Sequence, residues 1–406
     1  MNTDEFSAAP GVPPDTAPQR ASRTVQLLGL SLGHALNDAY VNFIVPLGPQ
    51  IEARFALSHS GFGLITFLWG LSTNFGQPVF GYLTDRWRPK RLIVIATLIS
   101  TFFFSYIGYA QSLPAFVAFL LLGGMGVALY HPRAGALTVH VSGSHRALGM
   151  GIFSAGGAVG YAAGFLCAPY LHGLTGDMRG LAYAAPAGVI GACLLLLVNV
   201  EGRAPRGDAT FSFRRHILPR WREVTALFVV MVLRSAAVSG FSLFIPLMLS
   251  DQGRNLIQGG QAGFFFIAGG ALGGMIGGHI SDRIGRREIT IVTLLLSPPI
   301  LYYALHTANL PSLAPFFVLL FVAGLVMRAA EPVNITHTQE VLPRGASLAA
   351  SLGMGGAWGV AGLIGPLVGA MADRHGVAYA LGWVVWIPVA AAVAAWFIPK
   401  GDTHRN

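Results

Sequence analysis

The chain has 406 residues, of which 53% are hydrophobic and only 11% are charged. Soluble domains carry about 25% charged residues, so this composition excludes an ordinary soluble domain. The net charge of +9 does not indicate a nucleic-acid partner, because the basic residues lie in short loops between apolar segments. We therefore expect a lipid bilayer around this chain and no bound nucleic acid.

The first 24 residues are rich in Pro, Ala, Ser and Thr and contain no apolar core. This composition predicts a disordered tail at 1–24 rather than a signal peptide. Apolar segments of helical length follow, each long enough to cross a bilayer. Strands of a membrane barrel would be about half as long and would alternate in polarity, so we predict an all-α membrane protein. The twelve predicted spans are 25–51, 60–83, 91–111, 114–139, 147–171, 181–200, 223–249, 260–281, 289–307, 312–338, 346–371 and 378–399.

Lys and Arg are distributed unequally between the loops on the two sides of these spans. The loops on one side hold only the arginines Arg54, Arg179, Arg254 and Arg374. Nearly all the other basic residues lie in the loops and tails on the opposite side. Because basic loops stay in the cytoplasm, this bias predicts that both termini are cytoplasmic.

The longest loop, 201–222, is polar and basic and divides the spans six and six. The two halves repeat in the same order: HALNDAYVNFIVPL at 34–47 aligns with RSAAVSGFSLFIPL at 234–247. Parallel six-helix repeats are a known transporter plan, with the substrate site near the midplane between them. We therefore predict two pseudo-symmetric six-helix bundles, at 25–200 and 223–400, with 201–222 as a cytoplasmic linker and 401–406 as a tail.

The first predicted span carries polar residues that a lipid-facing helix would not. His34, Asp38 and Asn42 follow one another at intervals of four, so a helix places them on one face. Asp38 lies roughly 20 Å along this helix at about 1.5 Å per residue, close to the bilayer midplane. A carboxylate there is costly in lipid and usually faces a water-filled cavity or a partner.

Charged residues also occur inside spans of the second half. Among the acidic residues, only Asp38 and Glu331 fall well inside spans, and Arg234 and Arg328 are the matching cations. Their ionised charges sum to zero, so each charge can be compensated. One interpretation is a structural set of salt bridges that fixes helix packing. The other is a site for substrate and protons.

The functional interpretation assigns two kinds of residue. Proton coupling falls to Asp38 or Glu331, and the sequence does not decide between them; we favour Asp38, because His34 one turn away can relay the proton. Arginines offer bidentate contacts to a carboxylate or phosphonate. The candidate substrate-binding residues are Arg234, Arg328, Asn37, Asn42, His131 and Gln77.

Two loops at equivalent positions carry the same charged pattern. DRIGRR at 282–287, with Gly278 upstream, resembles the loop signature of the major facilitator superfamily, and GYLTDR at 81–86 is a second copy in which Arg88 and Pro89 depart from it. An Asp at such a helix end can pair with Arg across the helix pairs and hold the cytoplasmic face shut. The candidate gate residues are Gly81, Asp85, Arg86, Gly278, Asp282, Arg283 and Arg286.

A narrower resemblance rests on LGHALNDAY at 32–40, GQPVFG at 76–81 and Tyr130-His131-Pro132. These motifs are similar to the fosmidomycin-resistance branch of that superfamily, whose members are taken to be proton-coupled drug exporters of the bacterial inner membrane. In the superfamily fold, the first and fourth helices of each half line the central cavity. The resemblance therefore implies an inner-membrane transporter with protons and a small molecule as its partners.

Glycines recur in the fifth span, from Gly149 to Gly164, and in the eleventh, from Gly353 to Gly369. Small residues let helix backbones approach closely, so we predict that these two helices pack across the interface of the halves.

The sequence contains no GxxxxGK[ST] loop, HExxH or CxxC motif, so we expect no cofactor, no metal and no direct use of ATP. We predict a monomeric secondary transporter that exports a small anionic or amphipathic compound in exchange for protons. The alternative is uptake of a small organic anion by proton symport. A membrane-embedded enzyme is disfavoured by the repeat, and a sensor would need a larger soluble output domain.

Overall fold

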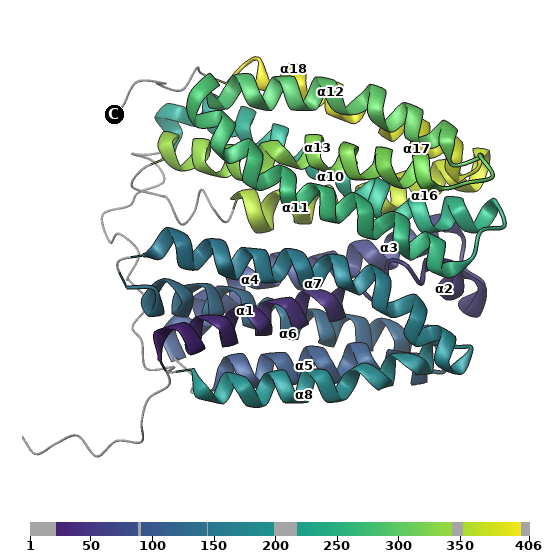
Figure 1. Ribbon diagram of the computed structural model, residues 1–406, viewed down its shortest axis with the longest axis horizontal. Coiled ribbons are helices and arrows are strands. Elements are labelled where there is room, and N and C mark those ends of the chain that lie inside the picture. The colour runs from purple at the N-terminus through teal and green to yellow at the C-terminus, as the bar shows by residue number, and fades with distance from the viewer. Residues whose placement is uncertain (1–21, 88–90, 144, 199–216, 343–351, 399–406) are drawn as a thin grey trace, which may run out of the picture.

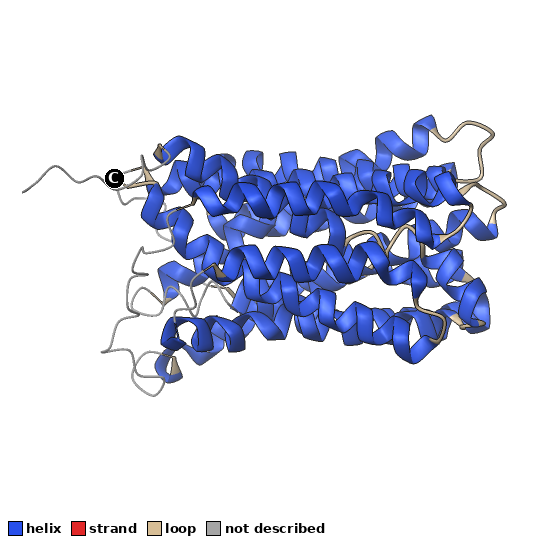
Figure 2. Ribbon diagram, turned by 90° about the horizontal axis from the view of Figure 1, so that it is seen from below, coloured by secondary structure: helices blue, strands red, loops and turns tan. Residues whose placement is uncertain are grey.

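The computed structural model describes residues 22–87, 91–143, 145–198, 217–342 and 352–398. The regular elements in these ranges are helices, and the ranges contain no strand. The long helices run side by side along the longest axis of the molecule (Figures 1 and 2). We call the end of the molecule at which the first helix begins and the last helix ends the terminal end, and the opposite end the far end (Figure 1). The all-α class predicted from the sequence is confirmed.

The helices fall into two groups that follow the order of the chain. Those before residue 199, the first half, lie together, and those after residue 216, the second half, lie beside them as a second group (Figure 1). The first half contains α1 Arg23–Val41, α2 Gly48–Phe55, α3 His59–Gly70, α4 Gly76–Trp87, α5 Leu92–Tyr106, α6 Leu113–Val141, α7 Arg146–Thr175 and α8 Ala185–Leu194. The second half contains α10 Trp221–Asp251, α11 Leu256–Ile284, α12 Arg286–Thr307, α13 Ala314–Val341, α15 Ala357–Ala361, α16 Ile364–His375, α17 Val377–Val384 and α18 Ile387–Ala395.

Short 3-10 or π-helical segments extend or connect several of these helices. They are Leu71–Phe75, Ile107–Tyr109, Met178–Ala184, Leu195–Leu197, Leu218–Arg220 and Leu352–Gly356. The described part of the predicted linker, 217–222, is therefore largely helical. The predicted tails at 1–24 and 401–406 and most of the linker lie outside the described residues, and the domain boundaries stay a prediction.

Nine helices or helix runs in the described residues are long and apolar enough to cross a membrane. They coincide with nine of the predicted spans, and the first, second and eleventh spans are instead built from shorter consecutive helices. The first span breaks between Val41, where α1 ends, and Gly48, where α2 begins, and Pro46 lies in this break. The second and eleventh spans each contain a π-helical turn, at Leu71–Phe75 and Leu352–Gly356.

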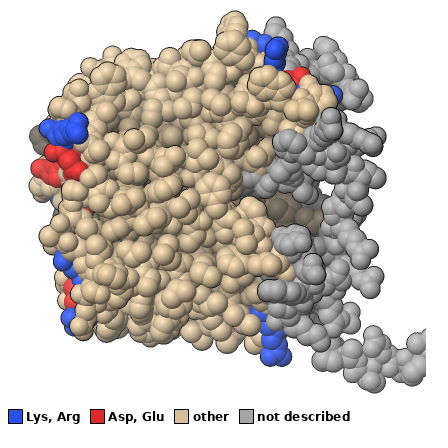
Figure 3. Space-filling view, turned by 180° about the vertical axis from the view of Figure 1, so that it is seen from behind, with Lys and Arg blue, Asp and Glu red and all other residues tan. Residues whose placement is uncertain are grey.

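Charged side chains are confined to the two ends of the molecule on the face seen in Figure 3. A broad band between them shows no Lys, Arg, Asp or Glu side chain. Large apolar side chains are exposed on many helices, among them Val159, Met275 and Phe397. In water such a surface would be a large apolar patch, so it indicates contact with lipid.

The two halves touch one another closely toward the far end. A side chain at Gly63 of α3 would meet the backbone of Gly365 in α16, and one at Gly369 would meet the carbonyl of His59. The prediction that the eleventh span packs across the halves is thus confirmed. A side chain at Gly260 of α11 would meet the carbonyl of Phe165 in α7, which joins the halves at a second place.

The fifth span, α7, also packs across the halves, against α11, as predicted, but the glycines that meet the backbone of α1 do not make that contact. Gly156, Gly160 and Gly164 of α7 face the backbone of α1, at Ser31, Ala35 and Ala39. Both helices belong to the first half, so these glycines serve packing within one half. The contact that α7 makes across the halves instead uses Phe165, whose carbonyl faces Gly260 of α11 and whose ring faces Gly263.

An acidic side chain also joins the halves at the far end. Asp373, near the end of α16, accepts hydrogen bonds from the backbone N–H groups of His59 (2.8 Å) and Ser60 (3.1 Å) at the start of α3. The first N–H groups of a helix have no partner within the helix and carry a partial positive charge, so a carboxylate there is favourable. The far end is therefore closed by contacts between the halves.

Candidate functional site

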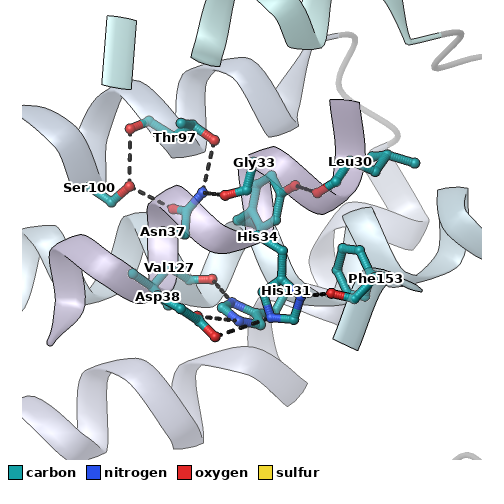
Figure 4. A network of polar contacts seen from close by, with 11 residues as sticks. Leu30, Gly33, His34, Asn37, Asp38, Thr97, Ser100, Val127, His131 and Phe153 are labelled. Atoms are coloured by element: carbon teal, nitrogen blue, oxygen red, sulfur yellow. Dashed lines mark hydrogen bonds and ion pairs between the residues drawn. The ribbon is translucent and has the colours of Figure 1, made fainter. Parts of the chain in front are cut away.

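Asp38 lies between two histidines, one on its own helix and one on α6 (Figure 4). Its Oδ2 is 3.3 Å from Nε2 of His34, and its Oδ1 is 3.1 Å from Nε2 of His131. The two imidazole rings contact each other edge to face at 4.8 Å between centroids. The Asp38 side chain keeps 17% of its surface exposed, so it is neither sealed in the core nor open to lipid. We call His34, Asp38 and His131 the first-half cluster.

Backbone carbonyls determine how the two imidazoles are protonated. Nδ1 of His34 is 2.8 Å from the carbonyl oxygen of Phe153, and Nδ1 of His131 is 2.9 Å from that of Val127. A carbonyl oxygen only accepts hydrogen bonds, so both Nδ1 atoms must donate. Both Nε2 atoms then face the Asp38 carboxylate, and each of these two contacts becomes a hydrogen bond only when a proton occupies it.

Helix α7 holds the first-half cluster in place. The ring of Phe153 stacks on His34 at 4.1 Å between centroids, in addition to the hydrogen bond from its carbonyl. A side chain at Gly157 would lie 2.8 Å from Oδ2 of Asp38 and would also overlap the His34 ring. The glycine thus leaves the space that this histidine–carboxylate pair occupies, and the sequence did not reveal that role.

The ligand atoms of the first-half cluster lie within 4.8 Å of one another, a spacing at which such residues can also hold a metal ion. The donor set by itself does not distinguish a metal from protons, since imidazole and carboxylate bind both. The two Nε2···O distances are 3.1 and 3.3 Å, so a proton shared between Asp38 and either histidine fits the cluster as it stands.

Two of the predicted substrate-binding residues form hydrogen bonds outside this cluster. Asn37 is fully buried; its amide donates to Gly33 O and Thr97 Oγ1 and accepts from Ser100 Oγ at 2.6 Å (Figure 4). Asn42 is also fully buried and donates to the carbonyl of Tyr161 at 2.6 Å. In this structure both side chains therefore hold helices together, and neither is accessible to a substrate.

The second half contains a cluster with two basic side chains and one acidic side chain. It is formed by Arg234 of α10 with Arg328 and Glu331 of α13. Nε of Arg328 is 2.9 Å from Oε2 of Glu331, and Nη1 of Arg234 is 3.4 Å from the same oxygen. We call these three residues the second-half cluster. Each cluster combines the first and the fourth predicted span of its half, as the sequence repeat indicated.

The two clusters lie within electrostatic range of one another across the halves. The Asp38 and Glu331 charges both interact with Tyr161 of α7, and the Asp38 charge also interacts with that of Arg328. His131, predicted as a substrate ligand, instead belongs with Asp38. Gln77 lies partly exposed on α4 and takes no part in the contacts of either cluster.

The gate residues of the second half form their own network at the terminal end. Nη1 of Arg286 is 3.1 Å from Oδ1 of Asp282, and its Nε and Nη2 contact Glu340 at 2.8 Å. These contacts join α11, α12 and α13, all in the second half, so they do not tie the two halves together. Arg283 is exposed, and Gly278 has open space where a side chain would be.

The first-half copy of the gate is described only in part. Gly81 lies beside Pro132 of α6, from which a side chain at Gly81 would be 3.5 Å away. The side chains of Asp85 and Arg86 lie outside the described residues. A latch at this copy stays a prediction.

Comparisons with known proteins agree with this architecture. A family model described as the Major Facilitator Superfamily matches residues 30–298 and 227–405. The Fosmidomycin resistance protein of Escherichia coli (strain K12) is 25% identical over 400 residues, which cover 95% of this chain and 96% of that protein. The predicted resemblance is confirmed at the level of the family and of this similarity.

Solved structures show the same fold. A bacterial homolog to the human lysosomal transporter Spinster, crystallised inward-facing and unoccupied, aligns with a TM-score of 0.71 and 20% identity over 92% of this chain and 96% of that one. A D-xylose-proton symporter aligns with a TM-score of 0.74 and 17% identity over 95% of this chain and 100% of that one. At these identities the likeness concerns the fold alone.

Proposed function

Given that this chain belongs to the Major Facilitator Superfamily, we propose that it is an inner-membrane secondary transporter that couples the movement of a small compound to protons. The observation that carries the proposal is the position of Asp38 between the Nε2 atoms of two histidines on facing helices. The family and the fold point to a transporter rather than an enzyme.

Proton binding at the first-half cluster follows from its geometry. With both Nδ1 atoms donating to carbonyls, the two contacts of Asp38 hold up to two protons. Without them, lone pairs of nitrogen and oxygen face each other, which is unfavourable in a poorly solvated site. Asp38 is therefore the proposed proton acceptor, and His34 and His131 share the proton with it.

Alternating access supplies the transport cycle in this proposal. The excess of Lys and Arg at the terminal end supports a cytoplasmic position for it. The far end, closed by Asp373 and by the backbone contact of α3 with α16, then faces outward. Rocking of the halves about the two clusters would expose the site to each side in turn. One charge moving through 100 mV supplies about 2.3 kcal/mol for uphill transport.

Export in exchange for protons is the preferred direction. Exchange requires the compound and the proton to occupy the site in turn. A small amphipathic or anionic compound that donates a hydrogen bond to Asp38 needs the carboxylate free of its proton, so proton entry would release it. The similarity to a protein named for fosmidomycin resistance supports this direction.

Uptake by symport is a second candidate, which the second-half cluster favours. The Glu331 carboxylate forms an ion pair with the guanidinium group that an anion would use, at 2.9 Å from Nε of Arg328. Protonation of Glu331 would free Arg328, so a proton and an anion would bind together. Binding of both to one state is what symport requires.

The test uses proteoliposomes that enclose a pH-sensitive dye, with wild type, Asp38→Asn and, as a matched control, Asp177→Asn at an exposed carboxylate of the far end. Fosmidomycin and simple organic acids serve as probes. We expect a substrate-triggered pH change in wild type and in Asp177→Asn, and none in Asp38→Asn. The sign of the change separates exchange from symport. Transport of labelled probe without any pH change in wild type would disprove proton coupling.

A further inference from the structure

The second-half cluster presents two guanidinium groups to one carboxylate oxygen. Arg328 Nε and Arg234 Nη1 both contact Oε2 of Glu331, at 2.9 and 3.4 Å. A carboxylate with both oxygens engaged can satisfy one guanidinium in a bidentate fork. Here a single oxygen serves two cations, so the cluster has fewer acceptors than it has donors.

The unmet donors belong to a deeply buried side chain. Arg234 is only 1% exposed, and its Nε and Nη1 have no hydrogen-bond partner among the described residues. Its Nη2 donates to Ser235 Oγ at 3.1 Å, and its guanidinium lies 5.9 Å from the ring of Trp358. Buried unsatisfied donors are rare in folded proteins and require an explanation.

The net charge of the second-half cluster also indicates that an acceptor is missing. Two arginines and one glutamate leave this cluster with one uncompensated positive charge. Asp38, in the other half, makes its ion contacts with His34 and His131, whereas those of the two arginines are with Glu331. The cluster is therefore complementary to a single additional negative charge.

Exposure shows which cation an incoming anion can reach. The side chains of Arg328 and Glu331 each keep 20% of their surface exposed, whereas Arg234 lies behind them. Gly270 of α11 supports this position of Arg328, because a side chain at Gly270 would overlap the Arg328 stem. Arg328 is thus the accessible guanidinium, and Arg234 acts on the Glu331 carboxylate from the buried side.

We propose that the Glu331 carboxylate is a built-in competitor of the substrate: it occupies the place on Arg328 that the acid group of a monoanionic carboxylate or phosphonate takes when the substrate binds. This inference rests on the proposed function and names its substrate class. On binding, the substrate oxyanion replaces Glu331 on Arg328, and Glu331 remains with Arg234. The arriving charge neutralises the cluster, and no covalent bond changes.

The experiment measures binding of benzoate, a monoanionic carboxylate, to the purified full-length protein in detergent, with neutral benzamide as the matched ligand control. Tryptophan fluorescence and the ligand-induced shift of the melting temperature report binding. Glu331→Gln removes the competing charge and should tighten benzoate binding about tenfold, within the usual range of coupling between two ligands. Benzamide binding should be unchanged.

Two further variants keep the test decisive. Glu331→Asp withdraws the carboxylate by one methylene and should tighten benzoate binding in the same direction but less, which covers the case in which Glu331→Gln fails to fold. Arg328→Gln in the Glu331→Gln background should abolish the benzoate response.

Weaker benzoate binding by Glu331→Gln, equal changes for benzamide, or no benzoate response in either Glu331 variant would overturn the proposal. No proton is measured in this experiment. Its failure beside a coupled pH change in the proteoliposomes would therefore remove the competitor role and leave proton-coupled transport intact.

Discussion

Replacing Asp373 by Ala should weaken the contact that holds the two halves together at the far end. The Asp373 carboxylate accepts two backbone hydrogen bonds from the start of α3, at 2.8 and 3.1 Å, and it is supplied by α16 of the other half. It therefore acts as a cap on α3 that exists only while the far end is closed. Opening of the far end in the proposed cycle must break it.

The size of the effect follows from capping energetics. Loss of a capping side chain costs about 1 kcal/mol, and loss of a negative charge at a helix N-terminus costs roughly 0.3–1 kcal/mol at an exposed site. Asp373 is exposed, so solvent screening places the sum near the lower end, at about 1–1.5 kcal/mol. This corresponds to a roughly 5- to 12-fold shift of the equilibrium toward the state with an open far end.

The shift can be measured with spin labels and double electron–electron resonance. Cysteines replace Ala53 and Arg374, two exposed residues on opposite halves at the far end, after Cys167 and Cys193 have been changed to Ala. The short interhalf distance reports the closed far end and the long distance the open one. Asp373→Ala should raise the ratio of the long-distance to the short-distance population by the factor given above.

Asp177→Ala is the matched control. Asp177 is also an exposed acid at the far end, but it accepts a hydrogen bond from the nearby Arg179 N–H and pairs with the Arg179 side chain, all within the first half. Equal distance distributions in wild type and Asp373→Ala, or an equal shift in Asp177→Ala, would refute the reasoning.

Three other outcomes follow from the structure. The hydrogen bond to Glu52 raises the pKa of His59, and so do the charges of Asp251 and Asp373, which lie in the other half and attract the protonated imidazole across the closed far end. Burial raises the pKa of Asp373, but hydrogen bonds from Ser60 and His59 outweigh it and lower that pKa. Protonated His59 therefore contributes fully to closure of the far end below about pH 6.5, and this contribution is lost as the pH rises through the raised pKa. The contribution of Asp373 is lost only below about pH 4. The same spin labels should therefore report the largest closed population between these two pH values, and a flatter pH profile in His59→Gln. Gly157→Ala should disturb the first-half cluster by about 1–3 kcal/mol and abolish substrate-triggered pH changes, whereas Gly151→Ala on the same helix, with open space around it, should not. Asn37→Ala should destabilise the protein by about 1–3 kcal/mol, seen as a lower melting temperature, with the apparent affinity for transported probes unchanged.

The sequence by itself determined the membrane class, the helical architecture and the residues that carry charge inside the spans. Apolar length and the positions of Lys and Arg are local properties, and they need no knowledge of packing. The repeat between 34–47 and 234–247 also placed charged residues at equivalent points of the two halves. The structure then brings them together as one cluster in each half.

Only the tertiary structure decided which residues share a cluster and which do not. The spacing of four predicts His34, Asp38 and Asn42 on one helix face, and all three do face α7. Only the packing against α7 decides that Asn42 binds the carbonyl of Tyr161 and stays out of the cluster. His131 joins Asp38 rather than the arginines, because α6 places it opposite α1. Asp373 and the start of α3 lie about three hundred residues apart in the chain, and their contact depends on how the two halves pack. Pairings of this kind arise from packing between distant segments, which is not encoded in the local pattern of residue types.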